Sequence, residues 1–392
     1  MSVLRGRQFF MHPGPTNIPD RVLRAMDRPA SDFMGKDFLE LRFRCADRLR
    51  AILKSKDAAV VFYASSGHGA WEAAVANTLS PGDKVLVCQS GYFSENWGIM
   101  AKAFGAEVEI LPTPDRKAVD PKAVEARLAK DDAREIKAVL VVHNETSTGT
   151  KHPVAEIRAA IDRVGHSALF FVDTISSLVS FDFRMDEWKV DVVVGGSQKG
   201  LMLPPGMSFT AVSEKAWNAA QSALNPRRYW DWRNMVENKR QVRFCGTAPI
   251  HFFYGLDASL TMIEEEGLEN VFIRHRRLAD AARACVNAWA AGGGPEVFPL
   301  DPAAASDSLT AVLMPKGHNA EDVRRIAESR FNVALGRGLG ALDGRVFRIG
   351  HMGDLNEPTL LGALAAVEMA LKMAKVPHGK GGLDAAMAVL AT

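Results

Sequence analysis

The stretches KAVLVVHN (137–144), SALFFVDT (167–174) and VDVVVGG (190–196) decide the fold class of this chain. Their apolar side chains come in unbroken runs, without polar residues in alternation, which is typical of strands that helices cover on both faces. Two earlier runs, AAVVFYA (58–64) and KVLVCQS (84–90), are also rich in strand-forming residues. Helical patterns follow most of these runs. We therefore expect an α/β domain with a mostly parallel sheet over about residues 57–215.

The remainder of the chain has a different character. A helix-like stretch over 253–291 ends at three glycines, and strand-like LTAVLMP (309–315) and RVFRIGH (345–351) then alternate with helical patterns near 320–330 and 357–374. This pattern predicts a smaller C-terminal α+β domain. We expect an N-terminal arm over 1–19, a large domain over 20–266 and a small domain over 267–392. The Gly- and Ala-rich last 15 residues are expected to fray.

The composition bounds the kind of partner. The 392 residues are 47% hydrophobic and 24% charged, as in globular proteins, and the net charge is only +2. Without a long Lys/Arg run, nucleic acids and anionic membranes are poor partners, and small-molecule substrates are favoured. The four scattered cysteines include no CxxC pair, which disfavours a disulfide framework or a bound metal. No apolar run suits a secretion signal or a membrane span, so we expect a cytoplasmic protein.

Polar residues follow several predicted strands. In an open parallel sheet, ligands bind where the carboxyl ends of the strands meet. The loop Ser65-Ser66-Gly67-His68-Gly69 stands between a strand and a helix, where small residues and a helix N-terminus suit a phosphate group. An ordinary glycine-rich turn is the alternative. The segment His143-Asn144-Glu145-Thr146 closes another strand and offers side chains to the same edge.

Two ionisable residues stand at neighbouring strand ends. Asp173 ends the run LFFV, and a carboxylate there needs a cation, such as a protonated pyridine nitrogen, or several hydrogen bonds. A helix or turn cap is the alternative. Lys199 follows VDVVVGG, and partial burial would lower its pKa enough for its amine to form an imine. A solvated surface lysine is the alternative. Together with the phosphate loop, the two residues form one consistent cofactor site.

The sequence resembles the class V aminotransferases of fold type I, which use pyridoxal 5'-phosphate, and among them the serine–glyoxylate and alanine–glyoxylate enzymes. The stretches that carry this resemblance run from end to end of the chain: HPGPTNIPDRV (12–22), SSGHGAWEAAV (65–75), HNETSTG (143–149), FVDTISS (171–177), GSQKGLMLPPG (196–206), EEEGLENVFIRH (264–275) and FRIGHMGDLNE (347–357). The resemblance implies a fold type I α/β transferase with a large cofactor-binding domain and a smaller C-terminal α+β domain.

The resemblance also assigns roles to individual residues. It implies that Lys199 carries the cofactor as a Schiff base and moves a proton during catalysis, and that Asp173 holds the pyridinium proton. The cofactor contacts that it implies are Ser66, Gly67, His68 and Gln198 at the phosphate, Thr146 at the phenolic oxygen, and Phe93 stacked on the ring. A core phenylalanine is the alternative for Phe93.

Three further residues concern the substrate and the partner subunit. The resemblance implies that Arg348 in FRIGH grips the substrate α-carboxylate and that Gly14 in the PGP turn closes over the substrate. Such enzymes are homodimers, and Thr247 matches a residue that reaches the phosphate in the neighbouring subunit. Just before it, Cys245-Gly246 replaces the Pro-Tyr pair of the serine enzymes.

This departure leaves the amino donor open. The resemblance favours L-serine with glyoxylate as acceptor, giving glycine. L-Aspartate is the other candidate, because its second carboxylate needs another cation, and four arginines lie near the departure: Arg227, Arg228, Arg233 and Arg243.

A lyase of the same fold, such as a cysteine desulfurase, would need a mobile loop cysteine in the C-terminal third, where Cys285 lies in a helical pattern. A dehydrogenase would need the absent GxGxxG fingerprint, and a non-catalytic scaffold would not explain Lys199 and Asp173.

Overall fold

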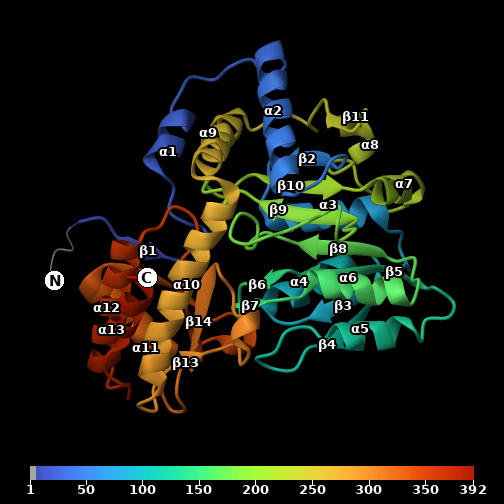
Figure 1. Ribbon diagram of the computed structural model, residues 1–392. Helices are drawn as coiled ribbons and strands as arrows, with labels where there is room; N and C mark the ends of the chain where they lie inside the picture. Colours follow the sequence, from blue (N-terminus) through green and yellow to red (C-terminus); the bar gives the residue numbers. More distant parts are fainter. Residues whose placement is uncertain (1–5) are drawn as a thin grey trace.

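The larger sheet of the molecule contains the strands that the sequence predicts. A computed structural model describes residues 6–392, and in this part of the chain the larger sheet has nine strands (Figure 1). In order across the sheet they are β11 (Val236–Glu237), β12 (Arg240–Gln241), β2 (Ala59–Tyr63), β10 (Ser208–Val212), β9 (Val192–Gly196), β8 (Leu169–Asp173), β5 (Ile136–Val142), β3 (Lys84–Gln89) and β4 (Glu107–Pro112). Strands β9, β8, β5, β3 and β4 are mutually parallel, whereas β10 is antiparallel to both β9 and β2. The expected mostly parallel sheet is confirmed.

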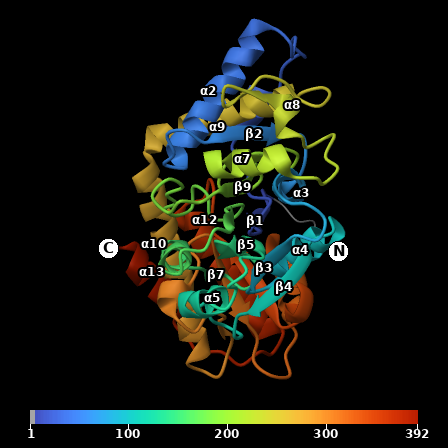
Figure 2. The same ribbon diagram turned by 90° about the vertical axis from the view of Figure 1, so that its right-hand side faces the viewer.

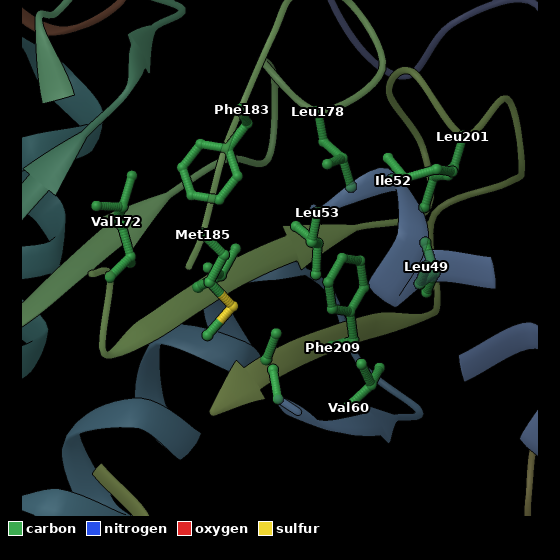
Figure 3. Packing of buried hydrophobic residues seen from close by; sticks show 14 of the residues in the cluster. Leu49, Ile52, Leu53, Val60, Val172, Leu178, Phe183, Met185, Leu201 and Phe209 are labelled. Carbon is green, nitrogen blue, oxygen red and sulfur yellow. The ribbon is translucent and has the colours of Figure 1, made fainter. Parts of the chain in front are cut away.

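Helices cover both faces of this sheet (Figures 1 and 2). On one face, Val60, Val172 and Phe209 belong to a core shared with α2 (Lys36–Ile52), α5 (Pro121–Leu128), α6 (Val154–Arg163) and α9 (Ile250–Glu266). Figure 3 shows part of this core, where α2 meets the strands. The opposite face packs on α3 (Gly67–Thr78), α4 (Tyr92–Ala103) and α7 (Glu214–Ser222). Burial on both faces is why the strand sequences are apolar without alternation.

A second, five-stranded sheet forms the smaller unit (Figure 1). Its order is β1 (Phe9–Met11), β15 (Val333–Arg337), β16 (Val346–Gly350), β14 (Leu309–Leu313) and β13 (Glu296–Val297). It shares a core with α10 (Leu268–Ala290), α11 (Ala320–Phe331), α12 (Glu357–Met373) and α13 (Gly382–Leu390). The segment predicted as an N-terminal arm, of which residues 1–5 lie outside the described part, contributes β1. This strand runs parallel to β15, with Phe9 opposite Val333.

Two expectations about the C-terminal region are wrong. The stretch 253–291 does not form one helix, because α9 ends at Glu266 and α10 begins at Leu268. Between them Gly267 has a φ of 85°, which a residue with a side chain rarely adopts. The chain end does not fray either: α13 occupies most of it, and Ala386 and Leu390 are buried in the second core. Apolar alanines and leucines at helical spacing outweigh the flexibility that its glycines suggest.

The carboxyl ends of β5, β8 and β9 meet at one edge of the larger sheet. Val142 at the end of β5 is paired with Asp173 at the end of β8, and Asp173 is paired with Val194 in β9.

Residues 6–392 contain no helix long and apolar enough to cross a membrane. In the same range no three histidine, cysteine or carboxylate side chains gather in a way that would hold a metal ion.

Candidate active site

Lys199 lies three residues beyond β9, with its side chain turned back toward the N-terminal segment. The side chain is buried, and its Nζ donates a hydrogen bond of 2.6 Å to the carbonyl oxygen of Pro13. Burial lowers the pKa of the Lys199 amine to about 7; the charge of Arg348 acts in the same direction and that of Asp173 opposes it. Near neutral pH a substantial fraction of this amine is therefore unprotonated and nucleophilic.

Gly14 provides the space that the Lys199 side chain occupies. A Cβ atom at Gly14 would lie 2.1 Å from Lys199 Nζ, and the backbone there has a φ of +128°. Any side chain at this position would both strain the backbone and displace the amine. The structure thus places Gly14 directly against the lysine, from a segment almost two hundred residues away in sequence.

Asp173 is a buried carboxylate at the end of β8. Its Oδ2 accepts a hydrogen bond of 2.8 Å from Trp71 Nε1, and its Oδ1 accepts one of 2.6 Å from the backbone N–H of Ile175. Burial raises the pKa of Asp173 to about 7, although these two hydrogen bonds favour the charged form. Within residues 6–392 no cation forms an ion pair with it. A cation placed against this carboxylate would offset the cost of burying its charge.

The start of α3 has the features of an anion site. Ser66 is the N-cap and makes no side-chain capping bond, so the first-turn N–H groups around Gly67 and His68 remain available. A Cβ atom at Gly67 would lie 2.3 Å from Ile175 Cδ1, while the methyl group Cγ2 of the same isoleucine lies 3.5 Å from the Cβ position of Gly196. Ile175 therefore joins the loop to the segment before Lys199. In that segment Gln198 Oε1 is buried, and no group in the described part of the chain donates a hydrogen bond to it.

A short hairpin follows β5 and continues the same edge. It consists of β6 (Asn144–Glu145) and β7 (Thr150–Lys151), and Thr146 is the first residue of its turn. Thr146 Oγ1 donates a hydrogen bond of 2.7 Å to Ser176 Oγ, and Asn144 Nδ2 donates one of 2.8 Å to the same atom. These bonds hold the Thr146 hydroxyl beside the segment that follows Asp173.

Arg348 on β16 reaches the hairpin from the second sheet. Its Nε donates to the carbonyl oxygen of Arg337 at 2.8 Å and its Nη1 to that of Thr146 at 3.1 Å. Burial lowers the pKa of the Arg348 guanidinium to about 10, and the negative charge of Glu145 opposes this change. The arginine remains charged at neutral pH. No residue of the described range accepts a hydrogen bond from its Nη2, which leaves that nitrogen for an anion.

Phe93 is half-buried in the first turn of α4. Its ring meets the indole of Trp71 edge-on, with 6.4 Å between ring centroids, and Trp71 in turn binds Asp173. The sequence did not single out Trp71, although it lies one turn into the helix after the glycine loop. A buried carboxylate at a strand end needs a hydrogen-bond donor, and an indole N–H is one. This need of Asp173 is the signal that could have pointed to Trp71.

Within one chain, some of the predicted site residues do not lie at the candidate active site. Thr247 is exposed on the loop between β12 and α9. The arginines considered for a second carboxylate are mostly engaged elsewhere. Arg227 is buried and donates to the carbonyl oxygens of Ala220 and Ala223 at 2.7 Å. Arg233 pairs with Asp231 at 2.9 Å, Arg243 pairs with Glu237, and Arg228 is exposed.

Comparison with known proteins identifies the family to which this chain belongs. The family described as aminotransferase class-V matches residues 8–342. The chain is 44% identical to the serine–glyoxylate aminotransferase of Methylorubrum extorquens over 96% of this chain and 94% of that protein. It is 42% identical to the L-aspartate–glyoxylate aminotransferase of Paracoccus denitrificans over 92% and 90% of the two chains. The crystal structure of ureidoglycine–glyoxylate aminotransferase from Bacillus subtilis matches it with a TM-score of 0.91 and 27% identity over 100% of both chains.

These matches confirm the predicted fold type I architecture, and they exclude the dehydrogenase and scaffold alternatives. The matches span nearly the whole chain, and with it both sheets and the elements that carry Lys199, Asp173 and Arg348. The enzyme is an aminotransferase, and the chain belongs to the class V aminotransferase family.

Proposed function

We propose that this enzyme is a pyridoxal 5'-phosphate-dependent amino-acid–glyoxylate aminotransferase, which makes glycine from glyoxylate with L-serine or L-aspartate as amino donor. The observation that carries the proposal is the buried amine of Lys199, whose pKa is about 7, at the same sheet edge as the carboxylate of Asp173, which has no ion pair within residues 6–392. Relatives named for serine and glyoxylate and for aspartate and glyoxylate support the substrate class.

The residues present fit this cofactor. A phosphate suits the uncapped start of α3, and the orphaned Gln198 Oε1 is a buried acceptor that a bound group with a donor, or a water beside the phosphate, would satisfy. A pyridinium N–H suits the carboxylate of Asp173, which has no cationic partner among residues 6–392. Pyridoxal phosphate supplies an aldehyde that condenses with amines and a ring that accepts the electrons released when a substrate C–H bond breaks.

We assign the cofactor contacts accordingly. Lys199 would hold it covalently, Asp173 at the pyridine nitrogen, Thr146 at the phenolic oxygen and Phe93 on the ring face. The phosphate contacts would be Ser66, Gly67, His68 and Gln198, with Thr247 from a second subunit. The exposed position of Thr247 within one chain suits this last role. We therefore propose a homodimer with shared active sites, in which each chain has an arm (1–19), a large domain (20–266) and a small domain (267–392).

Two side chains would handle the substrate. Lys199 Nζ would be the base that takes the proton from Cα of the amino donor, and its lowered pKa leaves a substantial fraction of the amine unprotonated near neutral pH. The carbonyl oxygen of Pro13 accepts a hydrogen bond from the amine and orients it. Arg348 would bind the α-carboxylate through Nη2, with Nε and Nη1 held by backbone carbonyl groups. Gly14 leaves room for both amine and substrate.

The lyase alternative lacks its nucleophile in the expected place. Cys285 is fully buried within α10, and burial raises the pKa of its thiol far above neutrality. A cysteine that attacks a bound substrate must be accessible and deprotonated. The position of Cys285 therefore favours amino transfer over sulfur removal.

A donor screen tests the proposal. The holoenzyme is incubated with glyoxylate and each of L-serine, L-aspartate and L-alanine, and glycine and the 2-oxo acid products are quantified. We expect glycine from serine, aspartate or both, in amounts equal to the 2-oxo acid. Absence of glycine with all three donors, from protein shown to contain the cofactor, would refute the function.

The same screen addresses the second carboxylate of aspartate. Of the four arginines near the departure from the serine enzymes, Arg228 is the one whose side chain is exposed and has no ion pair in the described range. If it meets the aspartate side chain, Arg228→Ala lowers kcat/KM for aspartate far more than for serine, because one donor alone loses an ion pair. Equal effects on both donors would remove Arg228 from this role.

A further inference from the structure

The first turn of helix α4 is hydrogen-bonded to side chains of the β6–β7 hairpin, which follows later in the chain. The backbone N–H groups of Phe93 and Ser94 donate to the two carboxylate oxygens of Glu145, at 3.3 and 3.0 Å. The N–H of Tyr92 donates to Ser147 Oγ at 3.0 Å. Three successive N–H groups of the first turn are thus bound by Glu145 and Ser147 of the β6–β7 hairpin, which fixes the start of the helix against that hairpin.

The contact between helix and hairpin is close and specific. A Cβ atom at Gly91 would lie 2.5 Å from Ser147 Oγ and 2.6 Å from Glu145 Cγ, so a side chain at Gly91 would push the two apart. Ser147 donates two further hydrogen bonds to Glu145 Oε1, from its N–H at 3.1 Å and its hydroxyl at 2.6 Å. Glu145 is completely buried without an ion pair in residues 6–392. The N–H groups and the positive end of the helix dipole stabilise its charge.

This contact lies beside the candidate active site. Phe93 is in the anchored first turn, and its ring meets Trp71, which binds Asp173. Thr146, next to Glu145, accepts the hydrogen bond from Arg348. One hairpin therefore determines where the ring of Phe93 stands relative to the carboxylate and the guanidinium.

We propose that Glu145 is a positioning residue for catalysis, which acts through the first turn of α4 to hold the ring of Phe93 against the cofactor. The inference rests on the proposed function, since it takes Phe93 as the ring that stacks on the cofactor. Glu145 itself touches neither substrate nor cofactor. We expect its effect on turnover to pass through Phe93, and this route distinguishes positioning both from general stabilisation of the fold and from the effect of its charge on Arg348 and Asp173.

A double-mutant cycle in the holoenzyme measures that route. The variants are Glu145→Gln, Phe93→Leu and the double variant, and kcat/KM with glyoxylate is measured for each with the better donor. Gln keeps the size of the side chain, but its NH2 group cannot accept the hydrogen bond from Ser94. We expect Glu145→Gln to lower kcat/KM by about tenfold or more in the wild-type background and by less than about threefold in the Phe93→Leu background. The visible circular dichroism of the bound cofactor should change with the first substitution.

Asp131→Asn is the matched control. Asp131 is also a buried carboxylate that accepts backbone N–H groups, those of Glu135 and Ile136, but it lies at the opposite end of β5. This variant should lower the melting temperature and leave kcat/KM per bound cofactor and the circular dichroism unchanged. If Glu145→Gln behaves in the same way, or if its loss in kcat/KM is equal in both backgrounds, the positioning role is wrong.

Ser147→Ala provides a milder route should Glu145→Gln fail to fold. It removes the acceptor for the N–H of Tyr92 and one donor to Glu145, and the same cycle with Phe93→Leu applies. The outcome is separate from the proposed function, because inactivity of the wild-type enzyme with every donor overturns that function. Activity in the wild type with independent effects of the two substitutions overturns the role of Glu145 alone.

Discussion

At the scale of single residues, burial brings two groups of opposite kind to the same pKa. The pKa of the Lys199 amine falls to about 7 and that of the Asp173 carboxyl rises to about 7, each chiefly through loss of solvent. A bound group can offset the cost of burying both side chains if it reacts with the free amine of Lys199 and places a cation against the carboxylate of Asp173. The pKa values thus describe a site prepared for a ligand that is itself cationic at one end.

The lysine prediction is the most direct. Lys199→Ala should bind the cofactor without a covalent bond and lose about four orders of magnitude in turnover, since a proton-transfer group is removed as well. Borohydride reduction and peptide mapping of the wild-type protein should find the pyridoxyl mass on Lys199. Because the fraction of unprotonated amine grows with pH, covalent uptake of cofactor by the apoenzyme should accelerate from about pH 6 to about pH 8. A pyridoxyl mass on another lysine would contradict the assignment.

Asp173→Asn should lower turnover by about two orders of magnitude or more, while the bond between cofactor and Lys199 still forms. The variant also has a signature in the apoenzyme. The folded-state pKa of Asp173 is raised from 3.8 to about 7, so its stabilising protonation is complete below the lower value and lost as pH rises through the higher one. The free energy of unfolding of wild type relative to the variant should therefore fall from pH 5 to pH 8, as urea titrations of both apoproteins at the two pH values would show. A constant difference would mean that Asp173 is charged throughout.

At the scale of elements, the sequence predicted strands better than connections. Asp173 could be found because it ends an apolar run, and Lys199 because it stands three residues beyond another, so that the ends of the runs fix their place near the sheet edge. Neither the bond of Trp71 to Asp173 nor that of Glu145 to α4 has a local pattern, since each joins segments that only the fold brings together. The break at Gly267 was missed because glycine also occurs within helices, and only its positive φ makes it a boundary.

Helix α13 provides a prediction at this scale. Leu390 is 8% exposed in the second core, so Leu390→Ala should lower the free energy of unfolding by about 2–4 kcal/mol. Met387 on the same helix is 45% exposed, and Met387→Ala should change it by less than about 0.5 kcal/mol. Denaturant titrations of the two variants compare them directly. Equal small effects would show that the chain end frays in solution, as its composition suggested.

At the scale of the whole molecule, the proposed shared active sites can be tested by mixing inactive chains. Lys199→Ala removes the amine, and Thr247→Glu places a carboxylate where the neighbouring subunit would bind phosphate. A hybrid dimer of the two variants has one site with an intact lysine and an intact threonine if Thr247 acts across the interface. Random exchange of subunits should then restore roughly a quarter of wild-type activity. If Thr247 serves its own chain, the mixture stays inactive. If no dimer forms, Thr247→Glu alone keeps its activity, because Thr247 is exposed within one chain.

The pairing of β1 with β15 has a consequence for biosynthesis. Phe9–Met11 leaves the ribosome more than three hundred residues before its partner Val333–Leu335. Until then Pro13 and Gly14, which border the Lys199 amine, lack the strand that holds them in place. The larger sheet can form earlier on the emerging chain, but the lysine acquires its complete surroundings only after β15 has been synthesised. A nascent chain would therefore be unable to retain the cofactor before its second sheet is synthesised.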